Sequence, residues 1–296
     1  QGERVVMRLL DKQSVLHDID DLGFWKDHYT QFHSLIRRPH GIILVTGPTG
    51  SGKTTTLYAG LSQINTPDKN ILTIEDPVEY QLEGVSQTQV NPKIDLTFAN
   101  GLRSFLRHDP DVILVGEIRD HETAETVIRV ALTGHLVFST VHTNDAPSTP
   151  ARLLNMGVEP YLLASSVRAI LAQRLVRKIC PHCRRDDETG TARELATSLS
   201  FGADVPVPPG EIRFRVGAGC DHCHQTGYSG RTAIFEILPV TSEVQELILS
   251  RAPATRLREA MAARGGLTLR ERGLALAVRG ETSVSEVLRV TADDAG

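Results

Sequence analysis

The stretch best suited to chemistry is a glycine-rich loop that ends in a lysine and a threonine. It reads Gly47-Pro48-Thr49-Gly50-Ser51-Gly52-Lys53-Thr54, with Thr55 following. This order fits G-x-x-x-x-G-K-[ST], in which backbone N–H groups cradle phosphate oxygens. We therefore predict that residues 47–55 bind the phosphates of ATP. Lys53 would reach the β- and γ-phosphates, and the Thr54 hydroxyl would ligate Mg²⁺.

The sequence on either side of the loop supports this prediction. An apolar, β-branched run at 42–46 precedes it, and residues 54–61 have the composition of a helix start. A strand, a glycine loop and a helix are the context that the motif requires, and the helix N-terminus adds positive potential. The alternative is a glycine turn with a chance lysine, and this context argues against it.

Carboxylates follow two other predicted strands. Glu75, Asp76 and Glu79 come directly after a short apolar run at 71–74, and Glu117 ends a buried-type run that begins at Asp111. Parallel strands present their carboxyl ends at one edge of a sheet, where ligands bind in open α/β folds. Glu117 is placed to hold the Mg²⁺ shell or to orient an attacking water. A solvated acidic loop at 75–79 is the alternative.

Basic and histidine side chains extend this predicted site. Arg103 and Arg107 lie four apart in a predicted helix over 96–108, so they share one face. That face is either solvated or it neutralises phosphate, and the sequence leaves both open. His135 and His142 flank an apolar run at 136–141. A single histidine is more often a core residue, but two at the ends of one strand favour phosphate sensing.

The four cysteines form two C-x-x-C pairs, with 36 residues between the pairs. They are Cys180, Cys183, Cys220 and Cys223. This pattern is typical of a structural four-cysteine zinc site, although the intervening segment is longer than usual. Two redox dithiols or disulfides are the alternatives.

Strands at 42–46, 71–74, 112–115 and 136–141 alternate with helical patterns, which indicates an α/β fold with a doubly wound, parallel-type sheet. We also expect a helix over 25–37, a long helix over 161–178 that leads to Cys180, and a loop-rich insert over 186–219. A strand follows at 232–236, and the remaining residues are helical. The predicted parts are the end of an N-terminal domain (1–11), an ATPase core (12–178), a four-cysteine zinc module (179–235) and a helical region (236–296).

Composition narrows the classes of function. The chain has 296 residues, 40% of them hydrophobic, and a net charge of −4. That charge, with no basic stripe interleaved with aromatic residues, disfavours a nucleic-acid partner. No apolar run approaches 18 residues and no signal peptide is evident, so we expect no membrane span. The chain opens within a strand-like pattern and lacks an initiator methionine, which we interpret as a piece of a longer protein.

Taken together, these motifs resemble one family. The relevant segments are 47–54, 74–79, 116–120, 133–143, Gln173-Arg174-Leu175 and the four cysteines. They are similar to the Walker A, Asp box, Walker B and His box of the secretion ATPases of the type II/type IV pilus superfamily, and most closely to the type II secretion (GspE) family. The resemblance covers essentially the whole chain.

The resemblance implies a RecA-like core in a homo-hexameric ring that hydrolyses ATP with Mg²⁺ and carries Zn²⁺. Such rings power pseudopilus assembly and protein export. They are cytoplasmic and associate peripherally with the bacterial inner membrane, where a missing N-terminal region docks on the secretion platform. Glu79 would polarise the attacking water, and Glu117 would be the Walker B glutamate. Further implied site residues are Arg8, reaching a neighbouring subunit's nucleotide, Arg103 and Arg107 near the γ-phosphate, and the His-box residues His135 and His142.

Other functions stay open at this point. A pilus-extension ATPase has a similar core, and a conjugation or DNA-uptake ATPase is a further relative. A nucleotide-binding scaffold that does not hydrolyse ATP belongs to a different class, which Glu79 and Glu117 argue against. A nucleic-acid motor is disfavoured by the negative charge.

Overall fold

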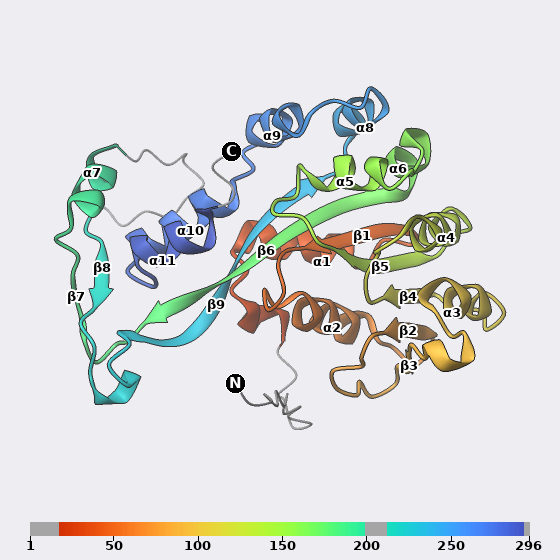
Figure 1. The fold of residues 1–296 in the computed structure, drawn as a ribbon, viewed down its shortest axis with the longest axis horizontal. Coiled ribbons are helices and arrows are strands. Elements are labelled where there is room, and N and C mark those ends of the chain that lie inside the picture. The colour runs from red at the N-terminus through yellow and green to blue at the C-terminus, as the bar shows by residue number, and fades with distance from the viewer. Residues whose placement is uncertain (1–17, 199–211, 293–296) are drawn as a thin grey trace, which may run out of the picture.

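The computed structural model describes residues 18–198 and 212–292 (Figure 1). Its centre is a seven-stranded sheet in the order β3-β2-β4-β5-β1-β6-β9. All neighbouring strands are parallel except the last pair, β6 and β9. The strands are β1 (Gly41–Thr46), β2 (Ile71–Glu75), β3 (Ser86–Gln89), β4 (Val112–Val115), β5 (Leu136–Val141), β6 (Val167–Ile179) and β9 (Tyr228–Pro239). The α/β prediction and its four core strands are confirmed.

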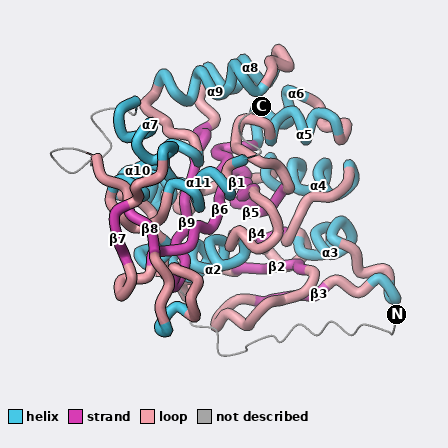
Figure 2. The backbone as a smooth tube through the Cα atoms, turned by 60° about the vertical axis from the view of Figure 1, so that its left-hand side comes forward, coloured by secondary structure: helices cyan, strands magenta, loops and turns pink. Residues whose placement is uncertain are grey.

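Helices cover both faces of this sheet, because its central strands are apolar on both sides. In β1, Ile43 and Val45 face one core cluster and Ile42 and Leu44 face another. Figure 2 shows α3 to α6 along one side of the sheet. The elements of this part are η1 (Ile19–Leu22), α1 (Lys26–Leu35), α2 (Lys53–Ile64), η2 (Pro92–Ile94), α3 (Phe98–Phe105), α4 (His121–Leu132), α5 (Thr149–Asn155) and α6 (Pro160–Ser166).

The long helix predicted over 161–178 is wrong. Helix α6 ends at Ser166 and the chain continues as β6, which pairs with β1 on one side and β9 on the other. Most of β6 is buried because it lies between two strands and is covered on both faces. A strand covered in this way is apolar without alternation, and periodicity alone does not separate it from a buried helix.

Beyond β6, the described part of the insert contains more regular structure than predicted. It contains β7 (Arg184–Asp186), α7 (Gly190–Ser198), β8 (Arg215–Gly217) and η3 (Asp221–Cys223), and β7 pairs with β8. Strand β9 then returns to the main sheet and crosses the predicted boundary at residue 235, and the division into four parts stays a prediction. The predicted C-terminal helices are α8 (Ser242–Leu249), α9 (Ala254–Ala263), α10 (Leu269–Val278) and α11 (Val284–Val290).

Within the described ranges, no helix combines the length and the apolar character needed to cross a membrane.

Candidate nucleotide-binding site

The glycine-rich loop connects the end of β1 to the start of α2, as predicted. Gly52 precedes the helix with φ 88°, a left-handed conformation that favours glycine. A Cβ on Gly47 would lie 2.5 Å from the carbonyl oxygen of Gln173, so a side chain there would collide with β6. The backbone of the loop is therefore shaped by two glycines that no other residue could replace without strain.

The loop presents polar atoms suited to phosphate. Lys53 Nζ donates to the carbonyl oxygens of Gly47 at 2.8 Å and Pro48 at 3.1 Å. The pKa of Lys53 is lowered, chiefly by burial. The nearby Glu117 carboxylate opposes this shift, and Arg174 adds to it. The buried Ser51 Oγ has no hydrogen-bond partner among the described residues. A half-buried cation and an unsatisfied hydroxyl at a helix N-terminus fit an anionic ligand.

A cavity of about 720 Å³ opens beside this loop. Its walls include residues 49–55 of the loop together with Glu75, Asp76, Glu79, Glu117 and His142. The carboxylates come from the ends of β2 and β4, which are neighbours in the sheet, so the sheet edge brings them together as predicted. The structure thus assembles the phosphate loop, two acidic segments and one of the two histidines around a single cavity.

Both carboxylate oxygens of Glu117 have a side-chain partner. Its Oε1 accepts a hydrogen bond from Arg119, and its Oε2 lies 3.1 Å from His142 Nε2. Burial raises the pKa of Glu117, but Arg119 and His142 outweigh burial and hold that pKa below its ordinary value. His142 is itself positioned by the next residue, since the Thr143 amide donates to Thr46 Oγ1 at 2.8 Å. Glu117 is therefore an anion at neutral pH, held next to Lys53.

Within one chain, three of the predicted site residues lie away from this cavity. His135 stands at the opposite end of β5 from His142, and its Nδ1 lies 3.1 Å from the carbonyl oxygen of Val130. At 3.3 Å per residue, the seven residue steps from His135 to His142 span about 23 Å. Arg103 pairs with Glu122 at 2.6 Å, and Arg107 Nη2 lies 3.4 Å from Ser104 Oγ. Arg8 lies outside the described residues.

The cavity also contains residues to which the sequence analysis gave no role in the site. They are Tyr80, Phe98, Arg119, Thr140, Leu175 and Arg231. Arg119 follows Glu117 by two residues, and this spacing at the end of a strand could have indicated it. Arg231 comes from β9, more than 170 residues after the glycine loop, and reaches the cavity only because β9 pairs with β6. No local sequence signal marks that contact.

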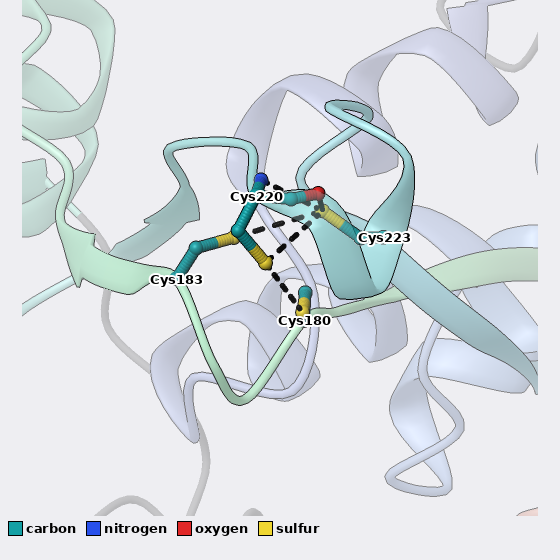
Figure 3. Close-up of side chains that lie close together, drawn as sticks. All are labelled: Cys180, Cys183, Cys220 and Cys223. Atoms are coloured by element: carbon teal, nitrogen blue, oxygen red, sulfur yellow. Dashed lines mark hydrogen bonds between the residues drawn. The ribbon is translucent and has the colours of Figure 1, made fainter.

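The four cysteines converge at the far ends of β6 and β9 (Figure 3). Their sulfurs all lie within 4.8 Å of one another. Individual Sγ–Sγ distances are 3.9 Å for Cys180–Cys220, 3.8 Å for Cys183–Cys223 and 3.7 Å for Cys220–Cys223. Four thiolates at 2.3 Å from a tetrahedral zinc would be about 3.8 Å apart. This donor set therefore fits Zn²⁺ and leaves no open position for a reacting water.

A glycine-rich phosphate loop at the carboxyl edge of a mostly parallel sheet, with helices on both faces, defines a P-loop nucleotide-binding fold. Residues 1–289 match the family model described as "Type II/IV secretion system protein". The chain belongs to this family.

Curated relatives and solved structures agree with the family match. The chain is 50% identical over 290 residues to the type II secretion system ATPase E of Vibrio cholerae serotype O1, covering 98% of this chain and 56% of the relative. It is 48% identical over 296 residues to the type IV pilus assembly ATPase PilB of Myxococcus xanthus, covering 99% and 51%. The chain thus spans about half the length of these relatives. A solved structure of the pilus retraction motor PilT with bound ADP is similar, with a TM-score of 0.68, 28% identity, and coverage of 95% of this chain and 68% of PilT.

Proposed function

We propose that this chain is the ATP-hydrolysing part of a type II secretion motor. This proposal rests on one observation. Lys53 and Thr54 line the same cavity as the two acidic residues Glu79 and Glu117. A phosphate loop alone would bind nucleotide. Carboxylates across from it add the means to orient a water for attack on the γ-phosphate.

The proposed roles follow from where each group lies. Backbone amides of residues 49–54 and the Lys53 ammonium hold the phosphates, and the Thr54 hydroxyl is the group that would ligate Mg²⁺. A bound Mg²⁺ would neutralise charge on the β- and γ-phosphates. Glu79 orients the water for in-line attack, and Glu117, kept anionic by Arg119 and His142, would help hold Mg²⁺ or orient the same water. The chemistry is positioning and electrostatic stabilisation.

We further propose that neighbouring subunits complete the site in a homo-hexamer. The predicted phosphate-neutralising groups Arg103, Arg107 and His135 all lie away from the cavity of their own chain. Any phosphate that these three groups neutralise would therefore belong to a nucleotide bound by another subunit, as is proposed for Arg8. A cation supplied in trans raises the rate of other nucleotide hydrolases by roughly 10³–10⁵. Docking to inner-membrane platform proteins through a further N-terminal region, which would localise the motor to the cytoplasmic face of that membrane, belongs to the same proposal.

The first experiment measures Mg²⁺-dependent ATP hydrolysis by the 296-residue chain, free and fused to a hexamer-forming partner. We expect fusion to raise turnover sharply and Lys53→Ala to abolish it in both forms. Fluorescent-nucleotide binding is measured in parallel. Hydrolysis by Lys53→Ala at the wild-type rate would disprove the phosphate-loop assignment, and a turnover that is independent of assembly would disprove completion in trans.

Two other functions are distinguished from this one by experiment. The 48% identity to a type IV pilus assembly ATPase makes pilus extension the second candidate, and complementation of secretion-deficient against pilus-deficient strains separates the two. Nucleotide binding without hydrolysis in the fused form would favour a scaffold.

A further inference from the structure

A buried hydrogen-bond network lies behind the cavity wall. Tyr58 is completely buried in α2, one helical turn after Thr54, and its hydroxyl donates to Glu75 Oε2 at the end of β2. Glu75 is only 3% exposed, and its other oxygen accepts a hydrogen bond of 2.5 Å from Thr73 Oγ1. The helix that follows the phosphate loop is therefore joined to the strand from which the acidic segment 75–79 departs.

Gln87 extends this network to the segment that carries Glu79. From β3, its Nε2 lies 3.2 Å from Glu75 Oε1, 3.1 Å from the Tyr58 hydroxyl and 3.1 Å from the Tyr80 carbonyl oxygen. Its Oε1 accepts from the Leu82 amide at 2.7 Å. The Gln87 amide thus contacts the buried Tyr58 and Glu75 side chains and also the backbone on the C-terminal side of Glu79.

The aromatic contacts place the same segment against Tyr58. The Tyr80 ring meets the Tyr58 ring edge-on, with centroids 4.7 Å apart. Burial raises the pKa of Tyr58 and so does its hydrogen bond to Glu75, whereas the backbone N–H of Glu79 acts in the opposite sense. Tyr58 is therefore a neutral phenol at physiological pH, and its oxygen lies beside the backbone of Glu79.

We propose that Tyr58 and Gln87 are positioning residues that fix the Glu79 carboxylate relative to the phosphate loop. This inference rests on the proposed ATP hydrolysis. Glu79 lies on a segment outside the helices and strands, and an orienting carboxylate displaced by about 1 Å can cost about 100-fold in rate. The network links this segment to α2, so the water-orienting group and the phosphate-binding group share one support.

The first test is Tyr58→Phe, which removes one oxygen and keeps the ring. We expect kcat for ATP to fall about 10-fold, while the affinity for a fluorescent ADP analogue stays within about twofold. Tyr29→Phe is the matched control, because Tyr29 is a half-buried tyrosine of α1 that lies outside the cavity. A Tyr58→Phe variant with wild-type kcat, or with kcat and nucleotide affinity reduced in parallel, would overturn the proposal.

The second test is Gln87→Met, which keeps the chain length and removes the hydrogen bonds. We expect the same loss of kcat, and a double variant with Tyr58→Phe no slower than about 10- to 20-fold, because both residues act through one network. Gln89→Met, an exposed neighbour on β3, is the control. Independent, multiplying losses of about 100-fold would contradict the shared network.

The two proposals fail in different ways. If wild type hydrolyses ATP, Lys53→Ala does not, and Tyr58→Phe and Gln87→Met match wild type, only the positioning role is wrong. If the hexameric wild type binds nucleotide without hydrolysing it, both the proposed function and the positioning role are overturned.

Discussion

His142 Nε2 lies 3.1 Å from Glu117 Oε2, and Arg119 holds the other oxygen of the same carboxylate. The three residues come from the ends of neighbouring strands β4 and β5 and the turn after β4. Two donors on one carboxylate favour its ionised form, and in a half-enclosed cavity this effect exceeds the cost of burial. The charge state of Glu117 therefore depends on its neighbours.

The first prediction concerns Arg119→Met and the pH dependence of hydrolysis. Burial is the largest single influence on the pKa of Glu117 and raises it, so removing the guanidinium that opposes burial should raise this pKa. The acid limb of the kcat profile should then move to higher pH, because Glu117 is protonated sooner as the pH falls. Steady-state rates from pH 5 to 9 measure this. Arg129→Met, whose exposed arginine pairs with Glu125 on α4, should leave the limb in place. An unshifted limb in Arg119→Met would mean that Glu117 does not control the rate.

The second prediction concerns stability and His28, which is 4% exposed in α1. Burial and the nearby Arg272 guanidinium, whose Nη2 lies 3.0 Å from His28 Nε2, lower the pKa of His28 to about 4, with Asp27 acting against them. The unfolded chain takes up this proton near pH 6.5. Between pH 6.5 and 4 the unfolded state thus binds more protons, and stability falls as the pH drops.

This histidine should account for about 3 kcal/mol of the stability lost between pH 7 and pH 4. His28→Gln keeps an acceptor for Arg272 and removes the titration, so its urea-unfolding free energy should depend less on pH. His33→Gln, in the same helix, is the control. Equal pH slopes for wild type and His28→Gln would show that His28 protonates equally in both states.

The third prediction is that the four-cysteine cluster holds one zinc per chain. The cysteine sulfurs are spaced for a tetrahedral ion, and structural zinc contributes directly to folding free energy. Elemental analysis should find a metal-to-chain ratio of one in wild type and well below one in Cys220→Ser. Chelation should expose the described residues 180–198 and 212–223 to limited proteolysis and spare β1 and β4. Protein purified without chelator and free of zinc would rule the site out.

The fourth prediction compares two arginines of α9. Arg258 donates to Asp145 Oδ2 at 2.5 Å, and the Asp145 side chain is 9% exposed. Arg256 pairs with Glu259, and both side chains are 64% exposed. Arg258→Ala leaves a buried carboxylate without its cation and should cost about 1–3 kcal/mol of unfolding free energy, whereas Arg256→Ala should cost less than about 0.5. Urea unfolding at pH 7 measures both, and equal losses would contradict the assigned difference in burial.

The parts of the fold that were predictable are those in which local sequence suffices. The phosphate loop needs glycines at fixed positions, and short buried strands such as β4 carry a compact apolar run between polar ends. Carboxylates just past those strands were expected to converge, because parallel strands end at a common edge. Glu79 and Glu117 do line one cavity.

The features that the sequence did not predict depend on pairing between distant segments. Strand β6 was predicted as a helix because, between β1 and β9, it is buried on nearly all sides and shows no alternation. His135 and His142 looked equivalent in sequence, but they stand at opposite ends of β5 and only His142 reaches the cavity. Gln87 and Arg231 carry no local signal, because their contacts exist only once β3 and β9 have joined the sheet.

Strands β6 and β9 form a long two-stranded ribbon that passes the phosphate loop at Gln173 and ends at the cysteines (Figure 1). From Gln173 to Ile179, β6 extends about 20 Å beyond the phosphate loop. Over that length, a tilt of the ribbon by about 5° at Gln173 would displace the cysteine end by about 2 Å. Any tilt of the ribbon beside the phosphate loop would therefore be carried to the four-cysteine cluster.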